Sequence, residues 1–226
     1  MMSKGSRFPS EARTLRDGTR QMTSHGSISH PSYFLQSSFL PDDKSLFFTS
    51  YRSGAPQLYL ATYPDGEITQ LTDGIPVHPF SAAYHQRSGS IIFTRRGALW
   101  AVDATTLEER LIFDLGDGQL GEPSLCPDGE WLTAAFRRGG QRGLVVGRLD
   151  GTAWHTIPFP RTVIHPQFHP LEPEWIEFAG DPAPRMFRVR RDGTGLECLY
   201  EHGNDEFVVH ETFLGRTGDI VFTIWP

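Results

Sequence analysis

Hydrophobic and polar positions alternate in short runs along most of the chain, and one arrangement recurs five times. Each copy has an apolar anchor, then a turn of Pro, Gly or charged residues, then an apolar run of strand length. The anchors lie 41 to 45 residues apart, at Phe39, Tyr84, Leu125, Phe168 and Phe213. A period of about 40–50 residues that carries several short strands is typical of a β-propeller blade. The pattern therefore predicts an all-β protein, a β-propeller of four-stranded antiparallel blades.

Alternation and turn residues also place the strands within each repeat. In the first repeat we expect strands over 32–38, 45–50, 57–63 and 67–71. The fifth repeat stops at Pro226, in or just after its second strand, so about four and a half blades and an incomplete ring are predicted. Propellers avoid unpaired strand edges. We therefore expect that the chain is a piece of a longer propeller or that a partner closes the ring, and favour the first.

The ends and the composition narrow the class of protein. Residues 1–27 are polar, with no apolar run of signal-peptide length, and are predicted to be a flexible N-terminal segment before a partial propeller domain over 28–226. No stretch approaches the roughly 20 apolar residues of a membrane span. The net charge of −6 gives no support to nucleic-acid binding. We expect a cytoplasmic protein without a nucleic-acid or membrane partner.

One position of each repeat is predicted to face the central channel, because the innermost strands of the blades line it. This position lies three residues before the anchor, and it is polar in all five repeats: Gln36, Ser81, Glu122, His165 and His210. Packing alone would more often place small apolar residues there. A functional site and a merely hydrated channel both explain the polar ring, and the sequence leaves the two open.

Two adjacent repeats place a histidine at this position, His165 in Ile-His-Pro-Gln-Phe and His210 in Val-His-Glu-Thr-Phe. An imidazole can accept a proton or bind a metal near neutral pH. Either histidine alone could equally be a hydrogen-bonded core residue, but the shared position favours a function. The neighbouring Gln167, His169 and Glu211 are more simply explained as contacts within blades or at the surface.

Several motifs resemble the oligogalacturonate lyases, a family of TolB-like propellers. The first is His30-Pro-Ser-Tyr-Phe-Leu-Gln-Ser-Ser-Phe-Leu-Pro-Asp-Asp-Lys, followed by Leu58-Tyr-Leu and Thr69-Gln-Leu-Thr. Further along the chain come His165-Pro-Gln-Phe, Arg191-Asp-Gly-Thr-Gly-Leu and His210-Glu-Thr-Phe. The resemblance covers roughly residues 28–226 and implies the first five blades of a seven-bladed propeller.

The resemblance also implies a function, the cleavage of digalacturonate and related pectin fragments by β-elimination. It implies that a divalent ion takes part, and that this ion is Mn²⁺, as in the family. It makes His165 the Brønsted base and His210 one metal ligand, while a glutamine and two histidines of a later blade would complete the metal site. The family's catalytic arginine lies in an excursion of the third blade that is short here, so Arg142 is the nearest candidate. Substrate contacts are expected from His30, Gln36 and Glu122.

These residue types suit the chemistry. Elimination removes a weakly acidic C5 proton beside a carboxylate, and a divalent ion on that carboxylate stabilises the charge that develops. The pKa of a neutral imidazole lies near working pH, which suits a general base. With one of the implied ligands, we expect the isolated chain to bind divalent ions weakly and to show little elimination.

Two other functions remain open. The chain could be a non-catalytic TolB-like propeller that acts as a binding or scaffolding module, or an inactive truncated lyase. A propeller that accompanies a hydrolase or peptidase would need a separate catalytic domain, which this sequence lacks.

Overall fold

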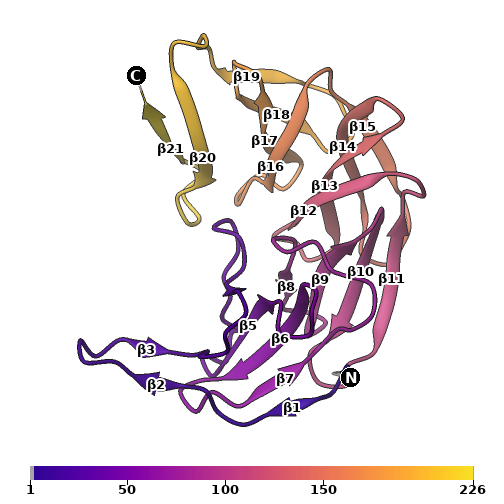
Figure 1. The fold of residues 1–226 in the computed structure, drawn as a ribbon. Helices are drawn as coiled ribbons and strands as arrows, with labels where there is room; N and C mark the ends of the chain where they lie inside the picture. Colours follow the sequence, from indigo (N-terminus) through magenta and orange to yellow (C-terminus); the bar gives the residue numbers. More distant parts are fainter. Residues whose placement is uncertain (1–2, 226) are drawn as a thin grey trace. The chain divides into compact units, whose positions relative to one another are not determined.

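The fold of the described residues, 3–225 in the computed structural model, consists of strands and turns (Figure 1). The chain divides into two compact units, residues 1–111 and 112–226. Within residues 3–225 there is no helix with the length and hydropathy needed to cross a membrane. The predicted all-β class is confirmed, as is its division into antiparallel sheets of the propeller-blade type.

The first unit, beyond which the end of β11 extends, contains two large antiparallel sheets in which most strands pair with their sequence neighbours, the exception being β1 with β7. The first sheet has the order β1-β7-β6-β5-β4, and the second the order β11-β10-β9-β8. A core of alternating apolar side chains, among them Phe47, Leu58 and Phe93, packs between these strands. The strand bounds are β1 (Arg7–Phe8), β4 (Ser29–His30), β5 (Ser45–Ser50), β6 (Gln57–Thr62), β7 (Ile68–Gln70), β8 (Ala83–His85), β9 (Ser90–Arg95), β10 (Ala98–Asp103) and β11 (Glu109–Asp114).

The second unit contains two four-stranded sheets and a hairpin, which follow one another along the chain in Figure 1. Side chains of both sheets form one apolar core that includes Leu144, Phe159 and Phe178. Together with the two sheets of the first unit, this gives the predicted four blades and the start of a fifth. The strands are β12 (Gln119–Leu125), β13 (Trp131–Arg138), β14 (Gln141–Arg148), β15 (His155–Pro158), β16 (Thr162–Phe168), β17 (Trp175–Asp181), β18 (Met186–Arg190), β19 (Glu197–Tyr200), β20 (Phe207–Phe213) and β21 (Ile220–Trp225).

One predicted strand, over residues 32–38, is wrong. This segment forms turns, and the innermost position of the first sheet is occupied by β4 and by an isolated bridge between Phe39 and Leu46. Pro31 has no N–H to donate to a ladder. The Ser32 amide instead donates to the Ser38 hydroxyl at 2.8 Å, and this bond closes the loop on itself.

The N-terminal residues are attached to the first sheet, which differs from the predicted separate segment over 1–27. β1 pairs with β7, and β2 (Arg13–Thr14) pairs with β3 (Arg20–Gln21). Arg52, only 6% exposed, donates to the Glu11 carboxylate at 2.9 Å and lies over the rings of Phe8 and Tyr59. A largely buried ion pair thus ties this segment to the blade, whereas its flexibility stays a prediction.

Removing one partner of this pair should destabilise the first unit. Glu11→Ala leaves the buried Arg52 guanidinium without its carboxylate, and we expect a loss of about 2 kcal/mol in the free energy of unfolding. Urea unfolding measures it. Glu130→Ala is the control, because it breaks an ion pair with Arg148 in which both side chains are over a third exposed, and should cost about 0.5 kcal/mol or less. Equal losses in the two variants would contradict the attachment described here.

Candidate functional site

The two histidines that the sequence singles out lie at matching irregularities of β16 and β20. The pairing of β16 with β17 skips from Ile164 to Gln167, and that of β20 with β21 skips from Val209 to Thr212. His165 and His210, inside these bulges, have positive φ angles of 55° and 59°. The first strand of the preceding sheet, β12, has its own irregularity around Glu122. Three of the five predicted channel positions therefore share one local backbone feature.

The sequence explains part of this geometry. Pro166 has no N–H to donate to the ladder, so a bulge at His165-Pro166 leaves one donor fewer unpaired than a bulge at other residues would. A left-handed conformation is uncommon for any residue with a side chain, and a residue that precedes proline usually adopts extended angles instead. Strain of this kind persists where surrounding contacts hold it, and it is concentrated at functional sites.

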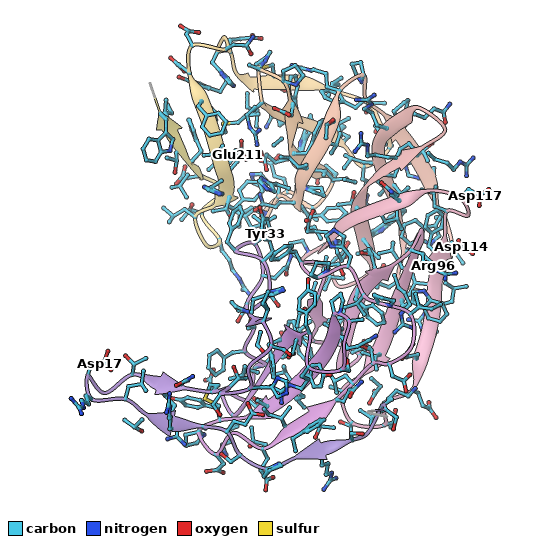
Figure 2. The ribbon with its side chains drawn as sticks, viewed as in Figure 1. Asp17, Tyr33, Arg96, Asp114, Asp117 and Glu211 are labelled. Atoms are coloured by element: carbon cyan, nitrogen blue, oxygen red, sulfur yellow. The ribbon has the colours of Figure 1, made fainter. Side chains whose placement is uncertain are left out.

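Glu211, the residue after His210, lies on β20 and is labelled in Figure 2, and its side chain connects this strand to β16. Its side chain is fully buried, and its Oε2 lies 3.1 Å from His165 Nδ1. Its other oxygen, Oε1, accepts a hydrogen bond of 2.9 Å from Nε of Arg185, which is itself buried. His165 is only 7% exposed. The result is a buried chain of three polar groups, His165–Glu211–Arg185, between β16 and β20.

The carboxyl of Glu211 is held in its charged form. Burial alone would raise its pKa, but the hydrogen bonds from His165 and Arg185 and the positive charge of Arg185 outweigh burial and lower the pKa to about 2. Near neutral pH this group is therefore a carboxylate with acceptor oxygens only.

Gln167 joins the same strands from the other side of the bulge. Its amide nitrogen donates to the Glu211 carbonyl at 2.9 Å and to the Glu177 carboxyl at 3.2 Å, and its oxygen accepts from the Thr212 hydroxyl at 3.1 Å. Burial first, and then the nearby charge of Glu211, raise the pKa of Glu177 well above its usual value. Two carboxyl groups of one cluster are thus driven toward opposite protonation states, a pattern typical of functional sites.

His210 is exposed, unlike its partner in the bulge pattern. An exposed imidazole can serve as one metal ligand. Within residues 3–225, however, no three His, Cys, Asp or Glu side chains come together in a group that could hold a metal ion. The described residues therefore fit a single ligand of the implied manganese site and do not form a whole site.

The other predicted site residues are dispersed. Arg142 lies in the β13–β14 hairpin opposite Arg137, and Glu122 lies half-buried on β12. In the first unit, the ring of His30 packs against Phe80 at 4.7 Å between centroids, and Gln36 lines a cavity of about 340 Å³. Their roles, and the convergence of the ring positions on one axis, stay predictions.

The sequence patterns did not indicate a role for Arg185 or Glu177. They favoured a contact within a blade or at the surface for Glu211. The signal for Glu211 was its position beside a histidine of the repeated slot. Glu177 sits in the apolar run Trp-Ile-Glu-Phe-Ala, where a lone carboxyl is itself a signal of a buried polar role. No pattern in the sequence pairs Arg185 with Glu211, 26 residues later.

Comparison with known proteins gives the following relatives. The chain is 25% identical over 243 residues to an oligogalacturonide lyase of Pectobacterium atrosepticum and 24% identical over 243 residues to an oligogalacturonate lyase of Dickeya dadantii. Both alignments cover 93% of this chain, which spans only 63% of the length of each relative. No family model matches the chain.

Solved structures agree on the fold. An oligogalacturonate lyase in complex with manganese matches with a TM-score of 0.89 at 21% identity, and an oligogalacturonate lyase from Vibrio parahaemolyticus with 0.86 at 20%. Each match covers 99% of this chain and 68% of the other. A putative TolB from Agrobacterium tumefaciens matches with a TM-score of 0.68 over 98% of this chain at 17% identity. The TolB-like propeller fold and the resemblance predicted from the sequence motifs are confirmed.

Proposed function

Because the chain is a distant relative of the oligogalacturonate lyases, we propose that the protein cleaves short oligogalacturonates, such as digalacturonate, by β-elimination. One observation carries the proposal. His165, the residue that the resemblance assigns to the base, lies in a strained bulge and contacts a buried carboxylate. Both features are typical of catalytic residues and are not expected of a surface histidine.

In this proposal His165 removes the C5 proton of the uronate ring. The proton is made acidic by the adjacent carboxylate carbon, and a neutral imidazole is a suitable base near neutral pH. Arg142 is proposed to assist at the substrate, and His30, Gln36 and Glu122 are proposed to contact it. The double bond forms between C4 and C5 as the glycosidic oxygen leaves C4, and that oxygen takes up a proton to become the hydroxyl of the released galacturonate.

A divalent ion of the manganese type is part of the proposal. When bound to the uronate carboxylate, such an ion stabilises the negative charge that develops as the C5 proton leaves. His210 is proposed as one of its ligands. Its imidazole is exposed, and it occupies in the bulge of β20 the position that His165 has in the bulge of β16. Further ligands would have to come from outside the described residues.

Turnover of digalacturonate with added manganese, followed by ultraviolet absorbance of the unsaturated product, tests the proposal. The 226-residue chain is assayed first. The second protein assayed is a chimera in which this chain replaces the matching region of the Pectobacterium atrosepticum lyase. The rest of that lyase supplies any missing metal ligands. We expect elimination by the chimera and little by the chain.

The matched control is His155→Ala. His155 is exposed on β15, where its Nε2 lies 2.8 Å from the Arg191 carbonyl, so this change should leave turnover within about twofold of the parent. A folded chimera that binds digalacturonate without cleaving it would instead favour the non-catalytic binding module.

A further inference from the structure

Building on the proposed function, we propose that Glu211 is the positioning residue of the base. It holds the His165 ring with the Nδ1 hydrogen directed at its Oε2, so that the lone pair that accepts the substrate proton lies on Nε2. Arg185 in turn fixes Glu211.

The contacts of the Glu211 carboxylate allow a single position for the hydrogen on the neutral His165 ring. Its two oxygens face different partners, with His165 Nδ1 at 3.1 Å from Oε2 and Arg185 Nε at 2.9 Å from Oε1. Arg185 is a donor only, and an ionised carboxylate is an acceptor only. His165 Nδ1 must therefore carry a hydrogen to bond with Glu211, and the neutral ring then has its lone pair on Nε2.

Glu211 is also held by contacts that do not involve the His165 side chain. The Glu211 side chain is 0% exposed, and its own carbonyl accepts from the Gln167 amide at 2.9 Å. The backbone of Glu211 is thus held to β16, and its side chain is held to Arg185, which directly precedes β18. A base that keeps one tautomer and one ring orientation needs such a partner, as general bases of catalytic triads do.

The tautomer of His165 can be measured on the 226-residue chain without any assay of turnover. Isotopically labelled histidine, recorded at alkaline pH, reports through its nitrogen chemical shifts which imidazole nitrogen carries the hydrogen. His165→Gln identifies the signal by its loss. We expect the hydrogen on Nδ1, and a neutral ring with the hydrogen on Nε2 would overturn the proposal.

Glu211→Gln should reverse the tautomer while keeping the size of the side chain. Because Arg185 can only donate, the amide oxygen of the new glutamine should turn to Arg185, and its NH₂ group should face His165 Nδ1. Nδ1 must then accept, which moves the ring hydrogen to Nε2. The matched control is Glu177→Gln. It changes a buried carboxyl of the same cluster that accepts from Gln167, and it should leave the tautomer of His165 unchanged.

Turnover by the chimera completes the test. Glu211→Gln should lower kcat by roughly 10²- to 10⁴-fold with little change in KM, because the base presents a hydrogen where it needs a lone pair. An unchanged kcat beside a reversed tautomer would overturn the positioning role. Absence of elimination in every variant, including the parent, would refute the proposed function alone, because the tautomer measurement does not depend on it.

Discussion

His165→Ala is expected to lower the kcat of the chimera for digalacturonate by about 10³-fold, the usual contribution of a general base. Elimination needs a base at C5, and the structure offers His165 within a buried polar cluster on β16. The manganese content of the purified variant should equal that of the parent, because the alanine removes the base and leaves His210 in place. Steady-state kinetics and metal analysis of the same sample measure both quantities.

His210→Ala is the comparison that separates the two histidines. It should lower the bound manganese, and turnover should fall with it and recover in part when manganese is added in excess. The assignment of base to His165 and of ligand to His210 would be wrong if both variants lost metal equally. It would also be wrong if excess manganese restored His165→Ala.

Glu211→Ala is expected to lower the free energy of unfolding at pH 7 by about 3 kcal/mol, because it removes the buried carboxylate partner of Arg185 and leaves the guanidinium only the exposed Asp181 carboxylate at 3.5 Å. The loss should depend on pH. The pKa of Glu211 is lowered in the folded protein from 4.5 to about 2, so its stabilisation is complete above about pH 4.5 and is lost as the pH falls toward 2. Urea unfolding, followed by tryptophan fluorescence, measures the free energy of unfolding of the parent and the variant. The difference between them should be large at pH 7 and smaller at pH 3.

Glu177→Gln should act in the opposite direction. Burial raises the pKa of Glu177, so the folded protein keeps a proton that the unfolded chain releases above about pH 4.5. Wild-type stability therefore decreases as the pH rises past this value, and the glutamine removes that decrease. We expect the variant to match the parent in acid and to be more stable at pH 7. Destabilisation by Glu177→Gln at pH 7 would show that Glu177 is ionised in the fold.

The strands and the repeat were predictable from the sequence because both depend on local patterns. The predicted strand over 45–50 coincides with β5, and those over 57–63 and 67–71 differ from β6 and β7 by one residue at one or both ends. The first innermost strand failed because Pro31 and the hydroxyl of Ser38 favour a loop, which outweighed the alternation of 32–38. The attachment of the N-terminal segment was missed because it depends on a long-range pair, Glu11 with Arg52.

The site was only partly predictable. The shared slot of His165 and His210 follows from the period of the repeat, whereas the bulges of β16 and β20 in which both lie were not predicted. The partners of His165 come from other strands and connections, since Glu211 is 46 residues away along the chain. Contacts of this kind depend on how neighbouring sheets pack, and no spacing in a single sequence reveals them.

The most direct test of elimination at this site is a mass spectrum of the products that the chimera forms from digalacturonate. Elimination splits the dimer without adding water, so we predict galacturonate and an unsaturated uronate whose masses together equal that of the substrate. With His165→Ala both products should form about 10³-fold more slowly. Two saturated galacturonates, which together carry one added water, would show hydrolysis. That result, or unsaturated product formed equally well without His165, would contradict the assignment of His165 as the base of a lyase.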